Sequence, residues 1–234
     1  MLVETMTHAE VFDELARDLP NLERFLTRQE KMMRRYALKH DRNDFPMSLI
    51  GKYTSPRRIK YVIIVFLMKR NADYCYYSVS TTRHTPAGNE VFMCKSHEDV
   101  KMAKVVCLPH AIKRYGERMK FTETGDELIK KMLVRSFNNA FSRDQRLGAR
   151  CVRYKGDMLY SLSTKDGAFL GKQNGDIFVT KTFITYDMMS GLQLEEFSKH
   201  REAFERGVDA ADVLIQEFNN RKSLRTNQPI AKRE

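Results

Sequence analysis

The chain has 234 residues, of which 42% are hydrophobic and 30% charged, so it can bury a sizeable core and does not have the composition of a disordered polymer. Lysine and arginine number 41 against 30 aspartate and glutamate residues, and the formal net charge of +11 favours a polyanionic partner, above all nucleic acid. The four cysteines form no CxxC pair, which favours reduced thiols over a disulfide framework.

The first forty residues have the pattern of helices. Apolar side chains recur every three or four residues between Val11 and Leu26, and we expect Pro20 to divide the segment 6–40 into two helices. Between residues 28 and 42 only Glu30 and Asp41 oppose a series of basic residues: Arg28, Lys31, Arg34, Arg35, Lys39 and Arg42. These residues fit a surface that follows phosphates or the solvated side of a helix, and we favour the solvated side.

A strand-rich region follows, from about 53 to 107. Its β-branched and aromatic residues predict four strands, at 59–67, 74–80, 90–94 and 104–108. The first two are expected to form a hairpin, and a turn signal at 86–89 precedes the third.

Helices and a second group of strands complete the chain. Pro109 suits the first turn of a helix over 109–120, and a second helix is predicted at about 125–141. Glycine-containing turns then separate four strands of an antiparallel meander, at about 150–154, 158–163, 168–172 and 177–184. Two polar helices follow, at about 192–206 and 209–220, and we expect the basic tail after them to be disordered.

These elements predict an α+β fold, in which a mostly antiparallel sheet packs against helices and helical segments lie at both ends. We divide the chain into an N-terminal helical segment (1–44), an α+β domain (45–220) and a basic flexible tail (221–234). The longest apolar run, 61–68, is too short to span a membrane, and the acidic N-terminus does not fit a signal peptide. We therefore expect a cytoplasmic protein without a membrane partner.

The segment 108–119, LPHAIKRYGERM, is the most informative for function. Its helix places His110, Arg114 and Arg118 at positions i, i+4 and i+8 of one stripe. Over about residues 107–186 the chain resembles the barnase, EndoU, colicin and RelE-type (BECR) ribonuclease superfamily, whose members often have a pHaxxRxxER helix, a second helix and a sheet ending in a vvT strand. The matching strand here is 177–184.

The resemblance implies metal-independent cleavage of RNA. It makes His110 the acid or base, Arg114 and Arg118 the phosphate clamps, and Lys181 with Thr182 the groups that stabilise the transition state. The same chemistry follows from the residue types, since cleavage without a metal or other cofactor needs a proton donor or acceptor and cations beside the phosphate. Arginine suits the second task because its guanidinium forks onto phosphate oxygens.

Each of these residues also has a structural interpretation. His110 can be an ordinary residue at a helix N-terminus, and Arg114 and Arg118 can form a surface salt-bridge cluster with Glu117. Counting in steps of two places Lys181 on the same strand face as Ile177, Val179 and Phe183, where it lines a cleft or extends from an edge.

Further candidates for nucleic-acid binding lie on the same segments. Lys113 adds a cation to the helix, and Tyr154, Tyr160 and Tyr186 flank the predicted sheet, where they can stack on unpaired bases. A tyrosine in a strand is more often a packing residue.

A zinc site competes with the catalytic interpretation of His110. Cys94 and His97 form one C-x2-H pair, and Cys107 and His110 form another, which together offer two sulfurs and two nitrogens. Both cysteines lie in apolar, strand-like runs, where a cysteine usually behaves as a small buried hydrophobe.

The leading prediction is an RNA-binding endoribonuclease of toxin type, with an antitoxin or immunity protein as a possible protein partner. The alternative is a nonenzymatic nucleic-acid-binding or assembly protein of a phage or mobile element, in which the same helix contacts phosphates without chemistry. A third interpretation is a protein-interaction module whose positive charge is incidental.

Overall fold

The computed structural model describes residues 2–41, 47–67, 70, 75–97, 100–136, 160–164, 166–191, 194–195 and 197–198. Its elements, in chain order, are α1 (His8–Ala37), β1 (Met47–Thr54), β2 (Lys60–Leu67), β3 (Tyr76–Thr85), β4 (Gly88–His97), β5 (Val100–Cys107), α2 (Pro109–Arg118), α3 (Gly125–Ser136), β6 (Tyr160–Thr164), β7 (Gly167–Asn174), β8 (Ile177–Thr185) and the 3-10 helix η2 (Tyr186–Met188).

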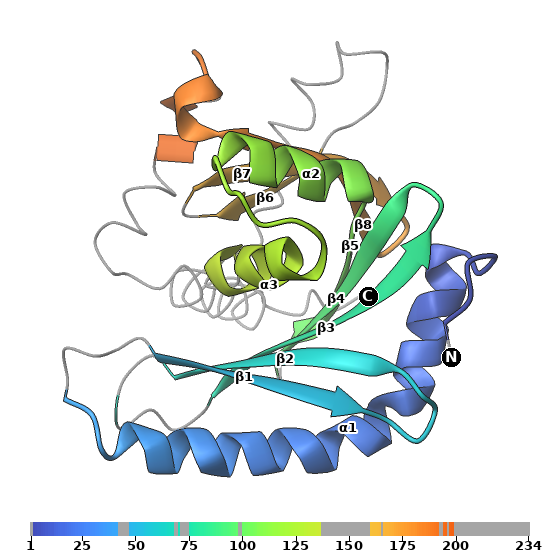
Figure 1. The fold of residues 1–234 in the computed structure, drawn as a ribbon, viewed down its shortest axis with the longest axis vertical. Coiled ribbons are helices and arrows are strands. Elements are labelled where there is room, and N and C mark those ends of the chain that lie inside the picture. Colours follow the sequence, from blue (N-terminus) through green and yellow to red (C-terminus); the bar gives the residue numbers. More distant parts are fainter. Residues whose placement is uncertain are drawn as a thin grey trace, which may run out of the picture.

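The strands form one eight-stranded sheet in the order β1-β2-β3-β4-β5-β8-β7-β6 (Figure 1). Strands β1 to β5 make an antiparallel meander, and β6 to β8 make a second one. The two meanders meet where β5 pairs with β8 in parallel. A parallel pair needs a crossover connection, and the chain between β5 and β8 contains α2 and α3. The predicted α+β class, with a mostly antiparallel sheet, is confirmed.

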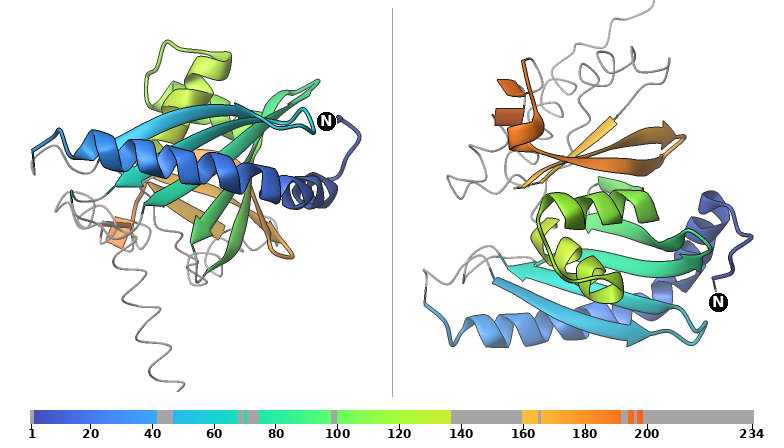
Figure 2. Two further views of the ribbon diagram at one scale, coloured as in Figure 1. Left: turned by 90° about the horizontal axis from the view of Figure 1, so that it is seen from below. Right: turned by 45° about the horizontal axis from the view of Figure 1, so that its top comes forward.

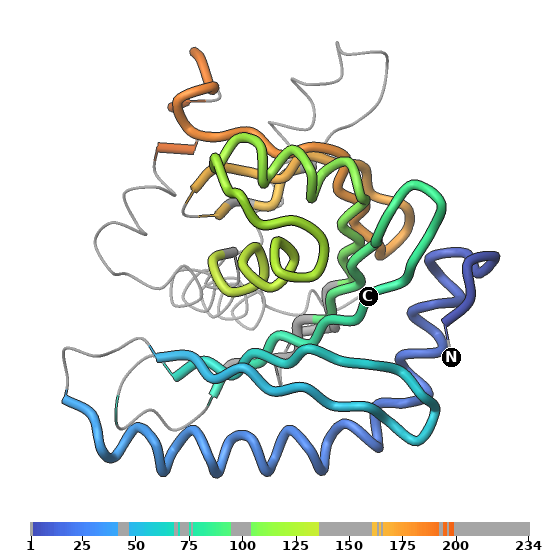
Figure 3. The backbone as a smooth tube through the Cα atoms, viewed as in Figure 1, coloured from blue at the N-terminus to red at the C-terminus, as the bar shows by residue number. Residues whose placement is uncertain are grey.

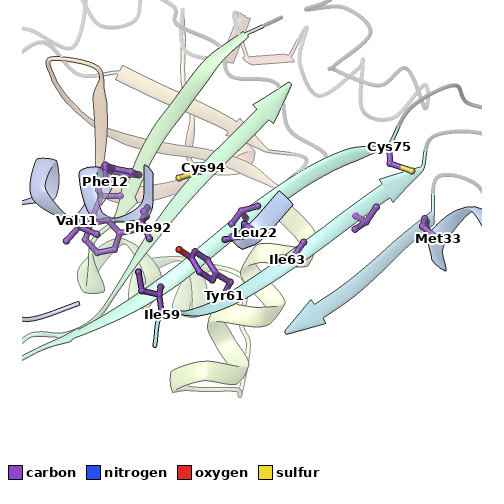
Figure 4. Close-up of a cluster of buried hydrophobic side chains, with 14 of the residues drawn as sticks. Val11, Phe12, Leu22, Met33, Ile59, Tyr61, Ile63, Cys75, Phe92 and Cys94 are labelled. Carbon is purple, nitrogen blue, oxygen red and sulfur yellow. The ribbon is translucent and has the colours of Figure 1, made fainter. Parts of the chain in front are cut away.

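Helices cover both faces of the sheet (Figures 1 and 2). On the face here called the α1 face, apolar residues of α1 pack against β1 to β5 and β8 in a cluster that includes Val179. Figure 4 shows other members of this cluster, among them Val11, Phe12, Leu22, Met33, Ile63 and Phe92. On the opposite α2–α3 face, a second cluster includes Ile64, Val105, Cys107, Tyr115, Met132, Phe169 and Phe183. The N-terminal helix therefore forms a common core with the sheet on the α1 face.

A single helix, α1, occupies the N-terminal segment where the sequence predicted two. Thr7 caps its first turn, because its side chain accepts from the Glu10 N–H and the Glu10 carboxylate accepts from the Thr7 N–H. Pro20 lies inside the helix, which changes direction along its length (Figure 3). Apolar side chains on both sides of Pro20 are buried against the sheet, so packing keeps the bent helix continuous.

Strand β1 was not predicted from the sequence. Its residues alternate between inward and outward positions, with Met47 and Gly51 buried and Ser48 and Lys52 exposed. A side chain at Gly51 would place its Cβ 3.0 Å from Oε1 of Gln29 on α1. Glycine therefore lets the helix approach this strand, but glycine also lowers the strand propensity of the segment.

The other described strands agree in position with those predicted at 59–67, 74–80, 90–94, 104–108, 158–163, 168–172 and 177–184, and the helices at 109–120 and 125–141 correspond to α2 and α3. The strand predicted at 150–154, the helix at 209–220 and the tail lie outside the described residues. Of the helix predicted at 192–206, residues 194–195 and 197–198 are described, and they are helical. No described helix is long and apolar enough to cross a membrane.

A β-bulge at Lys181 changes the phase of β8. Gly171 of β7 pairs with Thr180, but the next residue, Leu170, pairs with Thr182, so Lys181 is the extra residue. Before the bulge, Val179 lies on the α1 face; after it, Phe183 lies on the α2–α3 face. The prediction that Lys181 and Phe183 share a face was therefore wrong, because simple alternation does not hold across a bulge.

Candidate nucleic-acid interface

Helix α2 is held on the sheet by aromatic packing. Tyr115 is fully buried, and its ring lies 4.8 Å from Phe183 and 5.6 Å from Phe169, measured between ring centroids. Ala111 and Ile112 are buried on the same side of the helix. This packing directs His110, Lys113 and Arg114 away from the sheet, where all three are exposed.

The N-terminus of α2 is positively polarised. Pro109 occupies the first turn, and the N-cap residue Leu108 offers no side-chain acceptor to the free backbone N–H groups. His110 is exposed there and forms no hydrogen bond or ion pair with another described residue. An anion at this end of the helix would meet the free N–H groups and the imidazole together.

Arg114 and Lys113 take part in the salt-bridge cluster that was the alternative interpretation of this helix. Glu117 receives Nη1 of Arg114 at 2.9 Å, and Nζ of Lys113 lies 3.9 Å from the same carboxylate. All three side chains are well exposed, so these pairs contribute little to stability and can exchange Glu117 for another anion.

Arg118 differs from its neighbours because it is half-buried and poorly compensated. Its Nη1 atom is buried and has no hydrogen-bond acceptor among the described residues. Burial and the positive charge of Arg114 lower the Arg118 pKa, and Glu117 only partly opposes them. A bound anion would supply the acceptor that this guanidinium lacks.

Lys181 and Thr182 are not brought together with His110. Lys181 continues the alternation of Ile177 and Val179 and lies on the α1 face, whereas α2 packs on the opposite face. Thr182 pairs with Leu170, which packs in a third cluster with Ala168 and Ile184, also on the α1 face. The sheet therefore separates these two residues from the His110, Arg114 and Arg118 stripe.

Lys181 instead lies close to Lys172 on the neighbouring strand. Desolvation lowers the Lys172 pKa, and the charge and hydrogen bond of Lys181 lower it further. Two ammonium groups side by side add to the positive potential of the α1 face.

The tyrosine candidates do not form a stacking surface among the described residues. Tyr186 is buried, and its hydroxyl donates to the backbone carbonyl of Thr164 at 2.6 Å. Its ring belongs to a small apolar cluster with Met189 and Phe197, so the predicted stacking role of Tyr186 was wrong and the packing interpretation is correct. Tyr160 lies in β6, but its side chain is outside the description, as is the whole of Tyr154.

The two cysteines of the candidate zinc site point to opposite faces of the sheet. Cys94 lies in the cluster on the α1 face and Cys107 in the cluster on the α2–α3 face, so they cannot bind the same ion. Burial raises the pKa of each thiol to about 12, partly offset by Lys104 beside Cys94 and by Thr180 beside Cys107. The C-x2-H spacing therefore does not describe a zinc site, because strand alternation separates its sulfurs.

A second basic surface lies on the outer side of α1 and was only partly recognised in the sequence. Its five members are exposed, recur at spacings of three or four residues and lie opposite the buried positions Leu22, Gln29 and Met33: Arg24, Arg28, Lys31 and Arg35 on the helix, and Lys39 in the turn after it. We call these five residues the basic stripe. None of them forms an ion pair with a described residue. Figure 2 (left) looks onto this side of the helix.

Arg34 is half-buried and paired with Glu30, so it is excluded from the stripe. Its Nη2 lies 2.7 Å from Oε1 of Glu30, and the other Glu30 oxygen accepts a 2.6 Å hydrogen bond from the Tyr77 hydroxyl. Burial raises the Glu30 pKa, but the bonds from Tyr77 and Arg34 outweigh it and leave the pKa below its usual value. The acid nearest the basic run is thus directed toward the sheet, and no described acid forms an ion pair with the stripe.

Comparisons with protein families, with curated proteins and with solved structures found no match. The BECR resemblance therefore rests on the residues of the 107–186 segment alone.

Proposed function

We propose that this protein binds nucleic acid, RNA in the first place, through the basic stripe of α1. The single observation that carries the proposal is that five exposed cations share one side of a long helix without an acid among them or an ion pair to a described residue. Nucleic-acid backbones bind such surfaces because each phosphate contact releases a condensed counterion. The net charge of +11 adds long-range attraction to the same partner.

The dimensions of the stripe fit a nucleic-acid backbone. Arg24 and Lys39 are fifteen positions apart, which is about 22 Å along a helix at 1.5 Å per residue. The same length of duplex axis carries about six phosphates on each strand. Five cations over this distance can therefore each reach a different phosphate.

The stripe also lowers the stability of the protein when no ligand is bound. Within α1, neighbours three or four positions apart carry like charges, as in Arg24–Arg28, Arg28–Lys31 and Lys31–Arg35. Each such pair destabilises a helix by about 0.2–0.5 kcal/mol. A bound polyanion turns this repulsion into attraction, whereas a merely solvated helix surface usually mixes both signs.

Binding is tested by fluorescence anisotropy with a labelled single-stranded RNA over a series of salt concentrations. If all five cations contact phosphates, log K falls with log[salt] at a slope of about −3.5. A protein that binds neither RNA nor DNA even at low salt would refute the proposal and favour an interaction module with incidental charge.

We further propose ribonuclease activity as a second candidate function, supported by the exposed His110 at the uncapped end of α2 and by the Arg118 donor that has no acceptor among the described residues. In this proposal His110 moves the proton, and Arg114 and Arg118 hold the phosphate. Lys181 and Thr182 are left out because the sheet lies between them and His110. Without cleavage, the same surfaces serve a nonenzymatic binding or assembly protein.

The cleavage test uses a mixed RNA pool in excess chelator, with wild type and His110→Ala compared by product mapping. His110 is exposed, so the variant keeps the packing of α2. Cuts made by wild type and lost in the variant would support the ribonuclease; RNA binding without cuts would leave the binding protein. This second proposal includes a cytoplasmic location. It also includes an antitoxin or immunity protein as the partner that blocks the toxin in the producing cell.

A further inference from the structure

The C-terminal end of the basic stripe carries an exposed aromatic side chain. Tyr36 is 46% exposed, and Met32, one helical turn before it, is 48% exposed. Both lie on the side of α1 between the stripe and the buried positions. Because they are one helical turn apart, they are neighbours on the helix surface and lie next to the cations of the stripe.

The ring of Tyr36 packs against the side chain of His40. It lies 4.5 Å from the imidazole of His40, measured between ring centroids, with the planes tilted by 53°. The turn after α1 brings His40 there, since the Lys39 and His40 N–H groups donate to the carbonyls of Tyr36 and Ala37. The same turn brings Lys39 next to Tyr36, so a cation of the stripe and the exposed ring are adjacent.

We propose that Tyr36 is a base-stacking site and that the ligand of the stripe is single-stranded nucleic acid. This inference rests on the proposed function of the stripe and names its substrate class. The cations of the stripe hold the phosphates, and a neighbouring base leaves the solvent to stack on the exposed ring of Tyr36. Proteins commonly bind unpaired strands with a row of cations and neighbouring aromatic rings. The cations contact the phosphates, and any base can stack on the rings because every base has a π-face.

A duplex does not satisfy the same surface. Its bases already stack on one another inside the helix, and only its phosphates are available to the stripe. Extruding one base costs a few kcal/mol in unstacking and unpairing. The ring of Tyr36 therefore gives the single strand a higher affinity than the duplex, whereas the cations alone bind both ligands.

The experiment compares a single-stranded RNA with its duplex, using wild type, Tyr36→Ala, Tyr36→Phe and Leu38→Ala in the same anisotropy assay. Leu38 is 63% exposed two positions further on and serves as the matched truncation of an exposed apolar side chain. All three changes are at exposed positions, so each variant keeps the buried residues of α1. Urea unfolding confirms that they remain folded.

We expect Tyr36→Ala to lose about 5- to 150-fold in affinity for the single strand, the range for one base stacked on an aromatic ring, and to bind the duplex as wild type does. Tyr36→Phe keeps the ring and the affinity, and Leu38→Ala binds both ligands as wild type. Equal affinities of Tyr36→Ala and wild type for the single strand would overturn the stacking site, as would an equal loss on both ligands. If wild type binds neither ligand, the function proposed for the stripe fails instead.

Discussion

Removing two charges from the basic stripe gives the sharpest prediction. Lys31→Gln and Arg35→Gln take away two exposed cations that lie one helical turn apart on α1. Each phosphate contact to a single strand contributes about −0.7 to the slope of log K against log[salt], so the slope of the double variant is shallower by about 1.4. With an unchanged affinity at 1 M salt, this difference is a loss of about 25-fold, or about 1.9 kcal/mol, at 0.1 M salt.

The matched control removes the same net charge elsewhere. Lys52→Gln and Lys60→Gln change two exposed lysines of β1 and β2 whose positions in the strands face away from α1. Anisotropy titrations at several salt concentrations give the slope for each protein. We expect the control to keep the wild-type slope. An equal change in both double variants would refute the stripe, because it would mean that only the net charge of the protein matters.

The same double variant has a stability consequence that checks the reasoning independently of any ligand. Within α1 it removes three like-charged pairs at spacings of three or four residues, Arg28–Lys31, Lys31–Arg34 and Lys31–Arg35, each of which costs a helix about 0.2–0.5 kcal/mol. Losing this repulsion raises the free energy of unfolding by about 1 kcal/mol at low salt, but Arg35 lies in the last turn of α1, where a cation favours the helix dipole by about 0.3–1 kcal/mol. The expected net change in urea is therefore a gain of less than about 0.7 kcal/mol, which shrinks as salt screens the charges. A variant less stable than wild type would contradict the view that these cations repel one another.

Three further predictions concern the fold that positions these surfaces. Gly171→Ala lowers the free energy of unfolding by about 3 kcal/mol in urea titrations, because its Cβ would lie 2.0 Å from the Val179 carbonyl oxygen; a neutral effect would contradict the close approach of β7 and β8 at the bulge. Phe183→Ala costs about 3–5 kcal/mol in the same assay, and a cost under 1 kcal/mol would show that its ring is not buried under α2. Glu30→Gln lowers the free energy of unfolding most above pH 4.5, because a carboxylate with a depressed native pKa stabilises the fold only when it is ionised. The difference from wild type shrinks as the pH falls through the lowered native pKa of Glu30. A difference that does not change between pH 7 and pH 3 would exclude this linkage.

Local pattern was enough to find most described elements. The helix α2 begins at a proline, and the hairpin of β7 and β8 turns at the Asn174–Gly175 pair, where β7 ends at Asn174 and Gly175 has a positive φ in the turn. Such signals lie within a few residues of the element they define, so a single sequence displays them. Tertiary packing explains the two elements that were not predicted correctly. The contacts of α1 with the sheet keep the helix continuous through Pro20, and the close approach of α1 to β1 requires a glycine at position 51.

The candidate site depends even more on tertiary packing than the helices and strands do. The sequence displayed a basic α2 with His110, Arg114 and Arg118 on one stripe, since helical spacing alone fixes which side chains share a side. It could not show that Lys181 and Thr182 lie across the sheet from that stripe. Their placement depends on the bulge and on which face each helix covers, and both are set by contacts between residues far apart in the chain.

The basic stripe of α1 combines the two kinds of information. Its residues and their spacing are written in the sequence, as is the net positive charge of the chain. Only the tertiary structure decided that Glu30 turns inward to Arg34 and Tyr77, and that the five cations of the stripe and the ring of Tyr36 remain exposed. The physical reason is that charge and periodicity are local properties of the chain, whereas burial and pairing depend on which distant strands a helix packs against.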